Sequence, residues 1–304
     1  TPMLSSLLVL SIGSLAMTKA PSSDAEWPSV GGDPGGARYS TLSQINSSNV
    51  SHLKQAWVIH TGDAKGDVPI QCTPIVVGGT MYLVTSGHRV VALNPVTGQR
   101  KWTFDSKNAD SRSGHSRSSR GVAYWSDEKT GGKRRVLYGT PDGRILSIDA
   151  SNGSPDPLFK TVDLRTELGL AGSSVYVGIS SAPTVHRDLV LVGIATGEDA
   201  NSAPGTIMAF SVRTGRKVWS FDVLPRTLNP QMQPFVGAAG AWSGYVSDIK
   251  NDVLFAATGS ASPDFEGIGR PGHNLYANCV LALDAKTGRK LWHYQTVYHD
   301  LWDH

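Results

Sequence analysis

The sequence predicts an all-β fold in which one antiparallel unit is repeated along the chain. Four segments share a pattern of an apolar strand, a polar turn that ends in glycine, and a second strand: RVVALNPVTGQRKWTF (89–104), RILSIDASNGSPDPLF (144–159), TIMAFSVRTGRKVWSF (206–221) and CVLALDAKTGRKLWHY (279–294). The composition, with 33 Gly and 17 Pro among 304 residues, is rich in turn-forming residues. No segment has the periodicity of a long amphipathic helix.

Each part of the repeat has a physical reason. Alternating apolar and polar residues give a strand two unlike faces. The turn opens with Asp or Asn in most repeats and closes with a glycine that can adopt positive φ, at Gly98, Gly153, Gly215 and Gly288. In three repeats a tryptophan follows four residues later, where it can pack against the next unit: Trp102, Trp219 and Trp292. The second repeat has Pro157 instead, so its docking contact must differ.

Further strands precede these hairpins and complete four-stranded units. They are TPIVVGGTMYLVT (73–85), RRVLYGT (134–140), SAPTVHRDLVLVGIA (181–195) and DVLFAATG (252–259), and LKQAWVIHTGD (53–63) indicates an earlier partial unit. Repeated sheets of this kind stack radially, because each unit needs a neighbour to cover its apolar face. The sequence therefore predicts an incomplete β-propeller of about four to five blades, with one blade edge open.

Charge and cysteine content exclude some classes of function. The net charge is +3, and 28 Lys and Arg are spread among 25 Asp and Glu, so no basic stripe for nucleic acid is present. The cluster Lys133-Arg134-Arg135 is interpreted as a solvated hairpin turn rather than a binding patch. Cys72 and Cys279 could form a disulfide, remain two free thiols or have no function, and two buried thiols are favoured. The sequence has no CxxCH motif for attached haem.

The N-terminal segment predicts export. Residues 7–17 (LLVLSIGSLAM) form an apolar run with the length of a signal-peptide core, too short to span a bilayer. A buried N-terminal helix is the alternative. We therefore expect a signal-peptide remnant at 1–20, a partial propeller domain at 21–304, and a periplasmic or secreted protein that could be membrane-associated.

The loops between the repeats carry a family resemblance. The ordered motifs are WPSVGGDPGGARYSTLSQINSSNVSHLKQAW (27–57), RGVAYW (120–125), TPDGRILSIDA (140–150), LVGIATGE (191–198), AWSG (241–244), RPGHNLYAN (270–278) and YQTVYHDLWD (294–303). Together they resemble the N-terminal part of the quinoprotein alcohol and sugar dehydrogenases, especially the glucose-dehydrogenase-like branch. Members are propellers of about eight blades that bind pyrroloquinoline quinone (PQQ) and a divalent cation such as Ca²⁺.

The resemblance implies roles for particular residues. Asp303, the second Asp of HDLWD, matches the catalytic base and also a group beside the cation, while Asp300 and His299 hold the loop. Glu198 matches a carboxylate ligand of the cation. Trp242 matches the aromatic floor under the quinone, and Arg120 matches an arginine that pairs with a PQQ carboxylate, which a planar guanidinium can do through two hydrogen bonds.

Other positions are weaker matches or depart from the family pattern. Thr140 is a candidate PQQ contact, and Gln71 stands at a cofactor-contacting position where many members have Glu. The alcohol-oxidising branch has adjacent cysteines over the quinone, where this chain has Gly114 and His115. Ser260 stands where that branch has an Asn ligand of the cation.

Two functions follow as alternatives. The first is PQQ-dependent oxidation of a sugar or alcohol, with electrons passed to a quinone or cytochrome. The second is a non-catalytic propeller that serves as a protein-interaction scaffold in the cell envelope; such a scaffold has no need of Arg120, Glu198, Trp242 and Asp303 in these motifs. Because one blade edge would be open, the 304-residue chain alone is expected to be poorly soluble or inactive.

Overall fold

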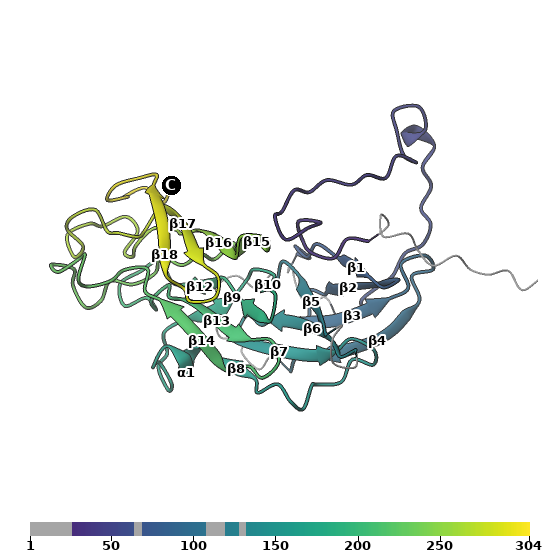
Figure 1. The fold of residues 1–304 in the computed structure, drawn as a ribbon, viewed down its shortest axis with the longest axis horizontal. Coiled ribbons are helices and arrows are strands. Elements are labelled where there is room, and N and C mark those ends of the chain that lie inside the picture. The colour runs from purple at the N-terminus through teal and green to yellow at the C-terminus, as the bar shows by residue number, and fades with distance from the viewer. Residues whose placement is uncertain (1–25, 64–68, 108–118, 128–131) are drawn as a thin grey trace, which may run out of the picture.

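Four antiparallel sheets of four strands follow one another along the chain (Figure 1). The computed structural model describes residues 26–63, 69–107, 119–127 and 132–304. The first sheet contains β1 (Ile75–Val77), β2 (Thr80–Val84), β3 (Arg89–Leu93) and β4 (Arg100–Asp105), and the second contains β5 (Val122–Ser126), β6 (Arg134–Gly139), β7 (Arg144–Asp149) and β8 (Val162–Asp163). The third contains β10 (Thr184–His186), β11 (Leu189–Leu191), β13 (Ile207–Ser211) and β14 (Lys217–Phe221), and the fourth β15 (Tyr245–Asp248), β16 (Val253–Ala257), β17 (Cys279–Asp284) and β18 (Lys290–Gln295).

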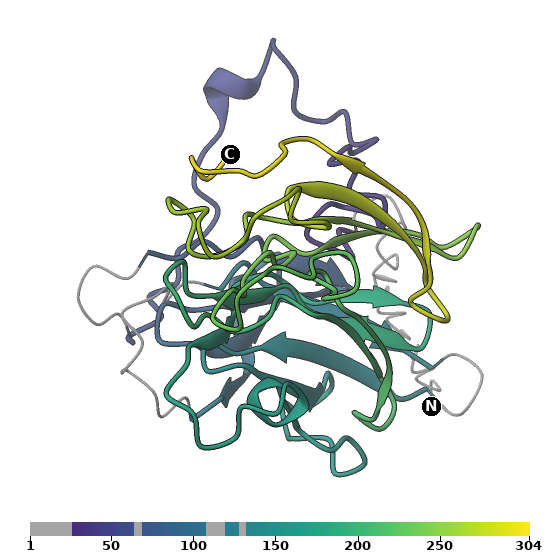
Figure 2. The ribbon, with the colours of Figure 1, turned by 90° about the vertical axis from the view of Figure 1, so that its left-hand side faces the viewer.

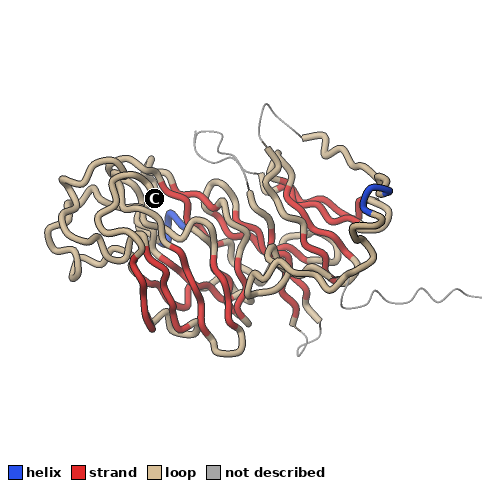
Figure 3. Tube along the Cα trace, turned by 90° about the horizontal axis from the view of Figure 1, so that it is seen from above, coloured by secondary structure: helices blue, strands red, loops and turns tan. Residues whose placement is uncertain are grey.

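The sheets are arranged as propeller blades. Within each sheet the strands pair in chain order, and the first strands contact one another in the order β1, β5, β10, β15. The four sheets thus share one side formed by their first strands. In Figure 1 the first sheet lies at the right, the second near the middle, and the third and fourth at the left, with the fourth above the third. Figure 3 shows the strands from above. The all-β fold and the partial propeller predicted from the repeats are confirmed.

Few other elements occur in the described residues. A separate hairpin pairs β9 (Val177–Ile179) with β12 (Ile194–Thr196). The helical elements are one turn of α-helix, α1 (Leu164–Glu167), and one 3₁₀ turn, η2 (Val50–His52). No helix in the described part of the chain is long and apolar enough to cross a membrane. The segment 39–57 projects away from the blades at the upper right of Figure 1 and at the top of Figure 2.

Two of the three repeat tryptophans dock neighbouring blades as the repeat predicts, whereas Trp292 is 47% exposed. Trp102 donates its Nε1–H to Ala150 O at 3.0 Å, and its ring covers Gly153, where a Cβ would lie 2.7 Å from the indole. Trp219 makes the equivalent hydrogen bond to Ala285 O at 2.9 Å. Glycine is needed at this turn for two reasons. Its φ is positive, and the indole leaves no room for a side chain.

The earlier partial unit is only partly confirmed. Trp57 donates to Pro95 O at 3.1 Å and lies over Gly98, which is the docking contact of the first blade. Residues 53–63 contain no assigned strand, however, and Leu53 and Val58 are exposed. The segment thus provides a docking tryptophan without a complete sheet around it.

The second blade docks through different side chains, as the absence of its tryptophan predicts. Arg135 on β6 is buried and donates to Val212 O at 3.2 Å, the carbonyl equivalent to Ala150 O and Ala285 O in their turns. It also forms an ion pair with Asp156. The interpretation of Lys133-Arg134-Arg135 as a solvated turn is therefore wrong for Arg135, which is a docking residue, while its two neighbours are exposed.

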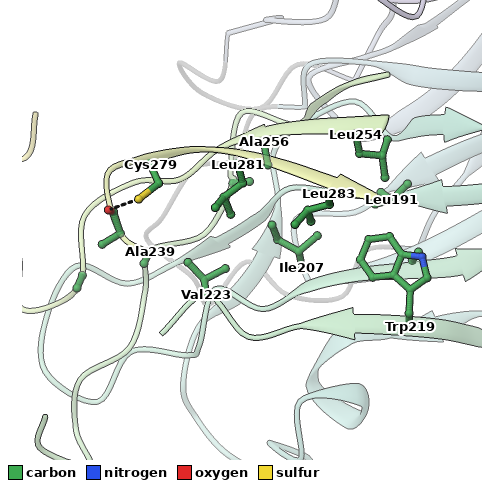
Figure 4. Packing of buried hydrophobic residues seen from close by; sticks show 14 of the residues in the cluster. Leu191, Ile207, Trp219, Val223, Ala239, Leu254, Ala256, Cys279, Leu281 and Leu283 are labelled. Carbon is green, nitrogen blue, oxygen red and sulfur yellow. Dashed lines mark hydrogen bonds between the residues drawn. The ribbon is translucent and has the colours of Figure 1, made fainter. Parts of the chain in front are cut away.

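Buried apolar residues fill the spaces between blades. Figure 4 shows the cluster between the third and fourth sheets, where Leu191 and Ile207 face Leu254, Leu281 and other apolar side chains. Both cysteines are free thiols, as favoured from the sequence, with Cys279 buried and Cys72 half-buried. Burial raises the pKa of Cys279 to about 12. The expected signal-peptide remnant at 1–20, and also Gly114 and His115, lie outside the described residues.

Candidate functional site

A pocket of about 270 Å³ lies where loops between the blades converge. Its wall includes four of the residues singled out from the sequence, namely Arg120, Glu198, Trp242 and Asp303. They come from four separate loops: before β5, after β12, before β15 and after β18. The fold therefore brings together side chains that are up to 183 positions apart in the chain (303 − 120).

Arg120 and Trp242 form the planar part of the site. The guanidinium carbon of Arg120 lies 5.1 Å from the centroid of the indole ring. The backbone of Arg120 is held between blades, because its N–H donates to Ser180 O at 3.0 Å and its carbonyl accepts from Thr73 N at 3.1 Å. Trp242 is 49% exposed, so a substantial part of the ring is open to a ligand.

Tight backbone packing sets the position of Trp242. A Cβ at Gly193 would lie 2.8 Å from the Trp242 carbonyl oxygen, so glycine lets the two loops meet. Ala238 and Ala239, also in the pocket wall, have φ values of 56° and 59°. Two consecutive alanines in the left-handed region are strained, and such strain is concentrated at functional sites.

Three carboxylates, Glu198, Asp264 and Asp303, share the pocket wall. Sequence reasoning missed Asp264, although it lies only four residues after Ser260 in the segment TGSASPDF (258–265). Its backbone N–H donates to Glu198 O at 3.1 Å, which ties the two loops together. Burial raises the pKa of Asp264 to about 7, and the neighbouring carboxylates of Asp303 and Glu198 add to the rise. The pocket is thus an acidic environment that favours protons or cations.

Asp300 has a supporting role, as predicted. Its buried carboxylate accepts hydrogen bonds from Ser260 Oγ at 2.6 Å and from His304 N at 2.8 Å. Burial alone would raise its pKa, but these hydrogen bonds outweigh burial and hold the pKa well below its ordinary value. His299 donates a hydrogen bond from Nδ1 to Gly272 O at 2.9 Å. Both residues fix the loop that carries Asp303.

Arg270 is a second supporting residue that sequence reasoning did not single out, although it opens the quoted motif RPGHNLYAN. It is fully buried, and its guanidinium donates to Asp300 O at 2.6 Å and to Asp264 O at 3.0 Å. It also donates to Asn274 Oδ1 at 2.8 Å. A buried arginine with these acceptors holds the Asp264 and Asp300 loops in one arrangement.

Thr140 and Gln71 do not line the pocket. Thr140 is fully buried, and its hydroxyl closes the β6–β7 turn by accepting from Arg144 N at 2.9 Å and by bonding to Asp142. Gln71 is exposed. Their proposed cofactor contacts remain predictions, but the four residues named above carry the site.

Among the described residues, no three His, Cys, Asp or Glu side chains are grouped closely enough to hold a metal ion by themselves. The donor chemistry is nevertheless that of a hard cation, because the charged side chains of the wall offer carboxylate oxygens. A cation held here would need further oxygen or nitrogen donors from a bound organic ligand.

The fold and the pocket define the class: a blade-repeat protein whose inter-blade loops collect an arginine, a tryptophan and carboxylates around one cavity. Residues 27–304 match the PQQ family described as "Glucose/ethanol/alcohol dehydrogenase, beta-propeller domain". The chain belongs to this family of quinoprotein dehydrogenase propellers.

Individual relatives agree with this assignment. The chain is 33% identical to the quinoprotein glucose dehydrogenase of Escherichia coli (strain K12), over 93% of this chain and 38% of the relative. It is 30% identical to the dehydrogenase subunit of alcohol dehydrogenase (quinone) from Gluconobacter oxydans (strain 621H), over 92% and 38%. The crystal structure of the quinohemoprotein alcohol dehydrogenase from Comamonas testosteroni superimposes with a TM-score of 0.79 and 29% identity, over 91% and 42%. The chain thus spans about two fifths of the length of these relatives.

Proposed function

We propose that this protein is part of a PQQ-dependent dehydrogenase that oxidises a sugar or an alcohol, in the manner of the glucose-dehydrogenase-like branch. The observation that carries the proposal is the shared pocket: Arg120, Trp242, Glu198 and Asp303 line one cavity although they come from four loops far apart in the chain. A scaffold propeller would have no need of this convergence. The relative with the highest identity quoted above is named a glucose dehydrogenase, which supports the choice of branch.

The residues present fit PQQ as a flat, anionic ligand. The half-exposed indole of Trp242 offers a face for stacking, and the adjacent guanidinium of Arg120 can pair with a carboxylate. The carboxylates of Glu198 and Asp303 supply hard oxygen donors for Ca²⁺ or another divalent cation beside the ligand. When bound, PQQ supplies the electron acceptor for oxidation of the substrate C–H bond.

Asp303 is the base in this proposal. Oxidation of an alcohol or sugar requires that the substrate hydroxyl lose its proton, and a carboxylate placed in the cavity wall can accept it. Asp303 is exposed and lies on a loop fixed by Asp300 and Arg270, so it combines access with a defined position. Its φ of 58° is a left-handed conformation, which Asp tolerates better than most residues.

The electron acceptor and the location belong to the same proposal. Relatives named alcohol dehydrogenase (quinone) and quinohemoprotein alcohol dehydrogenase support a quinone or a cytochrome as the acceptor. The apolar run at 7–17 supports export, and hence a periplasmic or secreted location with possible attachment at a membrane.

Replacing Asp303 tests the activity. In the dehydrogenase of which this chain is proposed to be part, supplied with PQQ, Ca²⁺, glucose and a dye acceptor, Asp303→Asn should lower kcat by about 10²- to 10⁴-fold while PQQ binding is retained. Glu266→Gln, a change of an exposed acid that does not line the pocket, is the control. Full activity in Asp303→Asn, or failure of the unchanged protein to bind PQQ, would refute the proposal.

A further inference from the structure

The Ser260 hydroxyl is hydrogen-bonded to two neighbouring side chains. Its hydroxyl donates to Asp300 Oδ2 at 2.6 Å and accepts from Asn278 Nδ2 at 3.1 Å. The family resemblance places a cation-binding Asn of the alcohol-oxidising branch at this position. Serine is shorter than asparagine, and this hydroxyl already holds a buried carboxylate, so the chain lacks the amide donor that the branch supplies here.

Asp264, four residues further along the same loop, offers an oxygen in its place. The side chain is only 4% exposed, lies in the pocket wall, and its Oδ1 is buried without a hydrogen-bond partner. A buried carboxylate oxygen without a partner is strongly disfavoured, unless a proton or a cation satisfies it. Its position beside Glu198 and Asp303 puts three carboxylates on one wall.

The nearby cation, Arg270, does not satisfy this oxygen. Its Nη2 donates to the backbone carbonyls of Pro263, Asp264 and Asp300, and its Nη1 donates to Asn274 Oδ1. Its Nε donates to Pro263 O at 3.2 Å. Arg270 therefore holds the backbone of the loop and leaves the Asp264 side chain facing the pocket.

We propose that Asp264 is a direct ligand of a hard, oxygen-seeking cation in this pocket, and that it takes over the donor position which Ser260 does not fill. The inference rests on the proposed function and deepens it. With Asp264 added to Glu198 and Asp303, all the ligands that the protein contributes are carboxylates. Such ligands favour cations with a high charge density over cations that prefer nitrogen or sulfur.

Cation binding can be measured without turnover. The full chain is titrated with Ca²⁺ by calorimetry, and its melting temperature is followed at the same concentrations, with and without PQQ. Asp264→Asn removes the charge with little change of shape, Asp264→Glu keeps a carboxylate, and Glu266→Gln removes an exposed acid from the same loop. We expect Asp264→Asn to weaken Ca²⁺ binding by about tenfold or more, because Ca²⁺ affinity follows the charge of the donor set.

The outcomes separate ligation from a structural role. Without Ca²⁺, Asp264→Asn should melt at or above the temperature of the unchanged protein, because it removes a buried charge; Ca²⁺ should then raise its melting temperature less. Asp264→Glu should recover part of the affinity, and Glu266→Gln should match the unchanged protein. Equal Ca²⁺ affinity in Asp264→Asn and the unchanged protein, or no Ca²⁺ response in either, overturns the inference.

The proposed function can fail separately. If the protein binds no PQQ but its Ca²⁺ response still depends on Asp264, the inference stands and the dehydrogenase proposal is refuted. If PQQ binds and Asp303→Asn abolishes turnover while Asp264→Asn leaves Ca²⁺ affinity unchanged, the dehydrogenase proposal stands and the inference about Asp264 is refuted.

Discussion

The guanidinium carbon of Arg120 lies 5.1 Å from the centroid of the Trp242 indole, in a cation–π contact at the candidate site. Trp242 is 49% exposed, so a flat anionic ligand stacked on the open part of this ring would lie near the Arg120 guanidinium. The contact therefore places the aromatic surface and the anion-binding group within reach of one ligand.

Arg120→Lys should weaken PQQ binding by roughly 10- to 100-fold, because an ammonium group cannot reproduce a two-hydrogen-bond contact with a carboxylate. The measurement is an equilibrium titration with PQQ followed by quenching of tryptophan fluorescence. Arg216→Lys, in the exposed β13–β14 turn, is the matched control. Equal affinities in the two variants would mean that Arg120 makes no such contact.

Gly153→Ala should destabilise the protein more than Gly172→Ala. Both glycines have φ of 78°, so both variants lose about 1–2 kcal/mol to the left-handed backbone. Only at Gly153 would the new Cβ meet the Trp102 ring, at 2.7 Å, while at Gly172 nothing lies within 4 Å. Overpacking should add about 1–3 kcal/mol, measurable as the difference between two urea unfolding curves. Identical curves would show that the indole moves aside without loss.

Arg135→Gln should lower the free energy of unfolding by about 3–5 kcal/mol, because it leaves the buried carboxylate of Asp156 without its charged partner. It also removes the hydrogen bond to Val212 O that joins the second and third blades. The neighbouring Arg134 is exposed, and Arg134→Gln should change stability by no more than about 0.5 kcal/mol. Chemical denaturation of both variants provides the comparison, and similar stabilities would refute the docking role.

The contribution of His186 to stability should fall when the pH drops below 6.5, the ordinary pKa of histidine. His186 is buried, with Nδ1 2.7 Å from Ser247 Oγ and Nε2 3.1 Å from Asp252 Oδ1, and burial lowers its pKa despite the nearby Asp252. A depressed pKa means that the folded state resists protonation, so the stabilisation present above pH 6.5 is lost as the pH falls through the folded pKa.

His186→Gln should remove this contribution, so the variant should lose less stability than the unchanged protein between pH 7.5 and about pH 5. The groups around His186 titrate elsewhere: hydrogen bonds from Lys286 and Arg187 hold the pKa of Asp252 well below its ordinary 3.8, so its effect is confined to more acidic solutions. Melting temperatures of the two proteins across this range decide the matter, and parallel curves would exclude His186 as the titrating group.

Local patterns in the sequence were sufficient for the blade architecture. The turn glycines and the tryptophans four residues later are short-range signals, and the structure places Trp102 and Trp219 on the turns of the following blades. The absence of a tryptophan at Pro157 also predicted a different contact. That Arg135 would provide it could not be predicted, because the sequence does not show which charged residue lies buried across a blade interface.

The sequence by itself determined the repeat, the family and four residues of one pocket, since motifs and periodicity are properties of neighbouring positions. Only the tertiary structure decided that the Thr140 hydroxyl is hydrogen-bonded within its own turn and that Ser260 is hydrogen-bonded to Asp300. It also decided that Asp264 has a buried oxygen without a hydrogen-bond partner. These outcomes depend on burial and on hydrogen bonds between loops far apart in the chain, which arise only when the blades pack together.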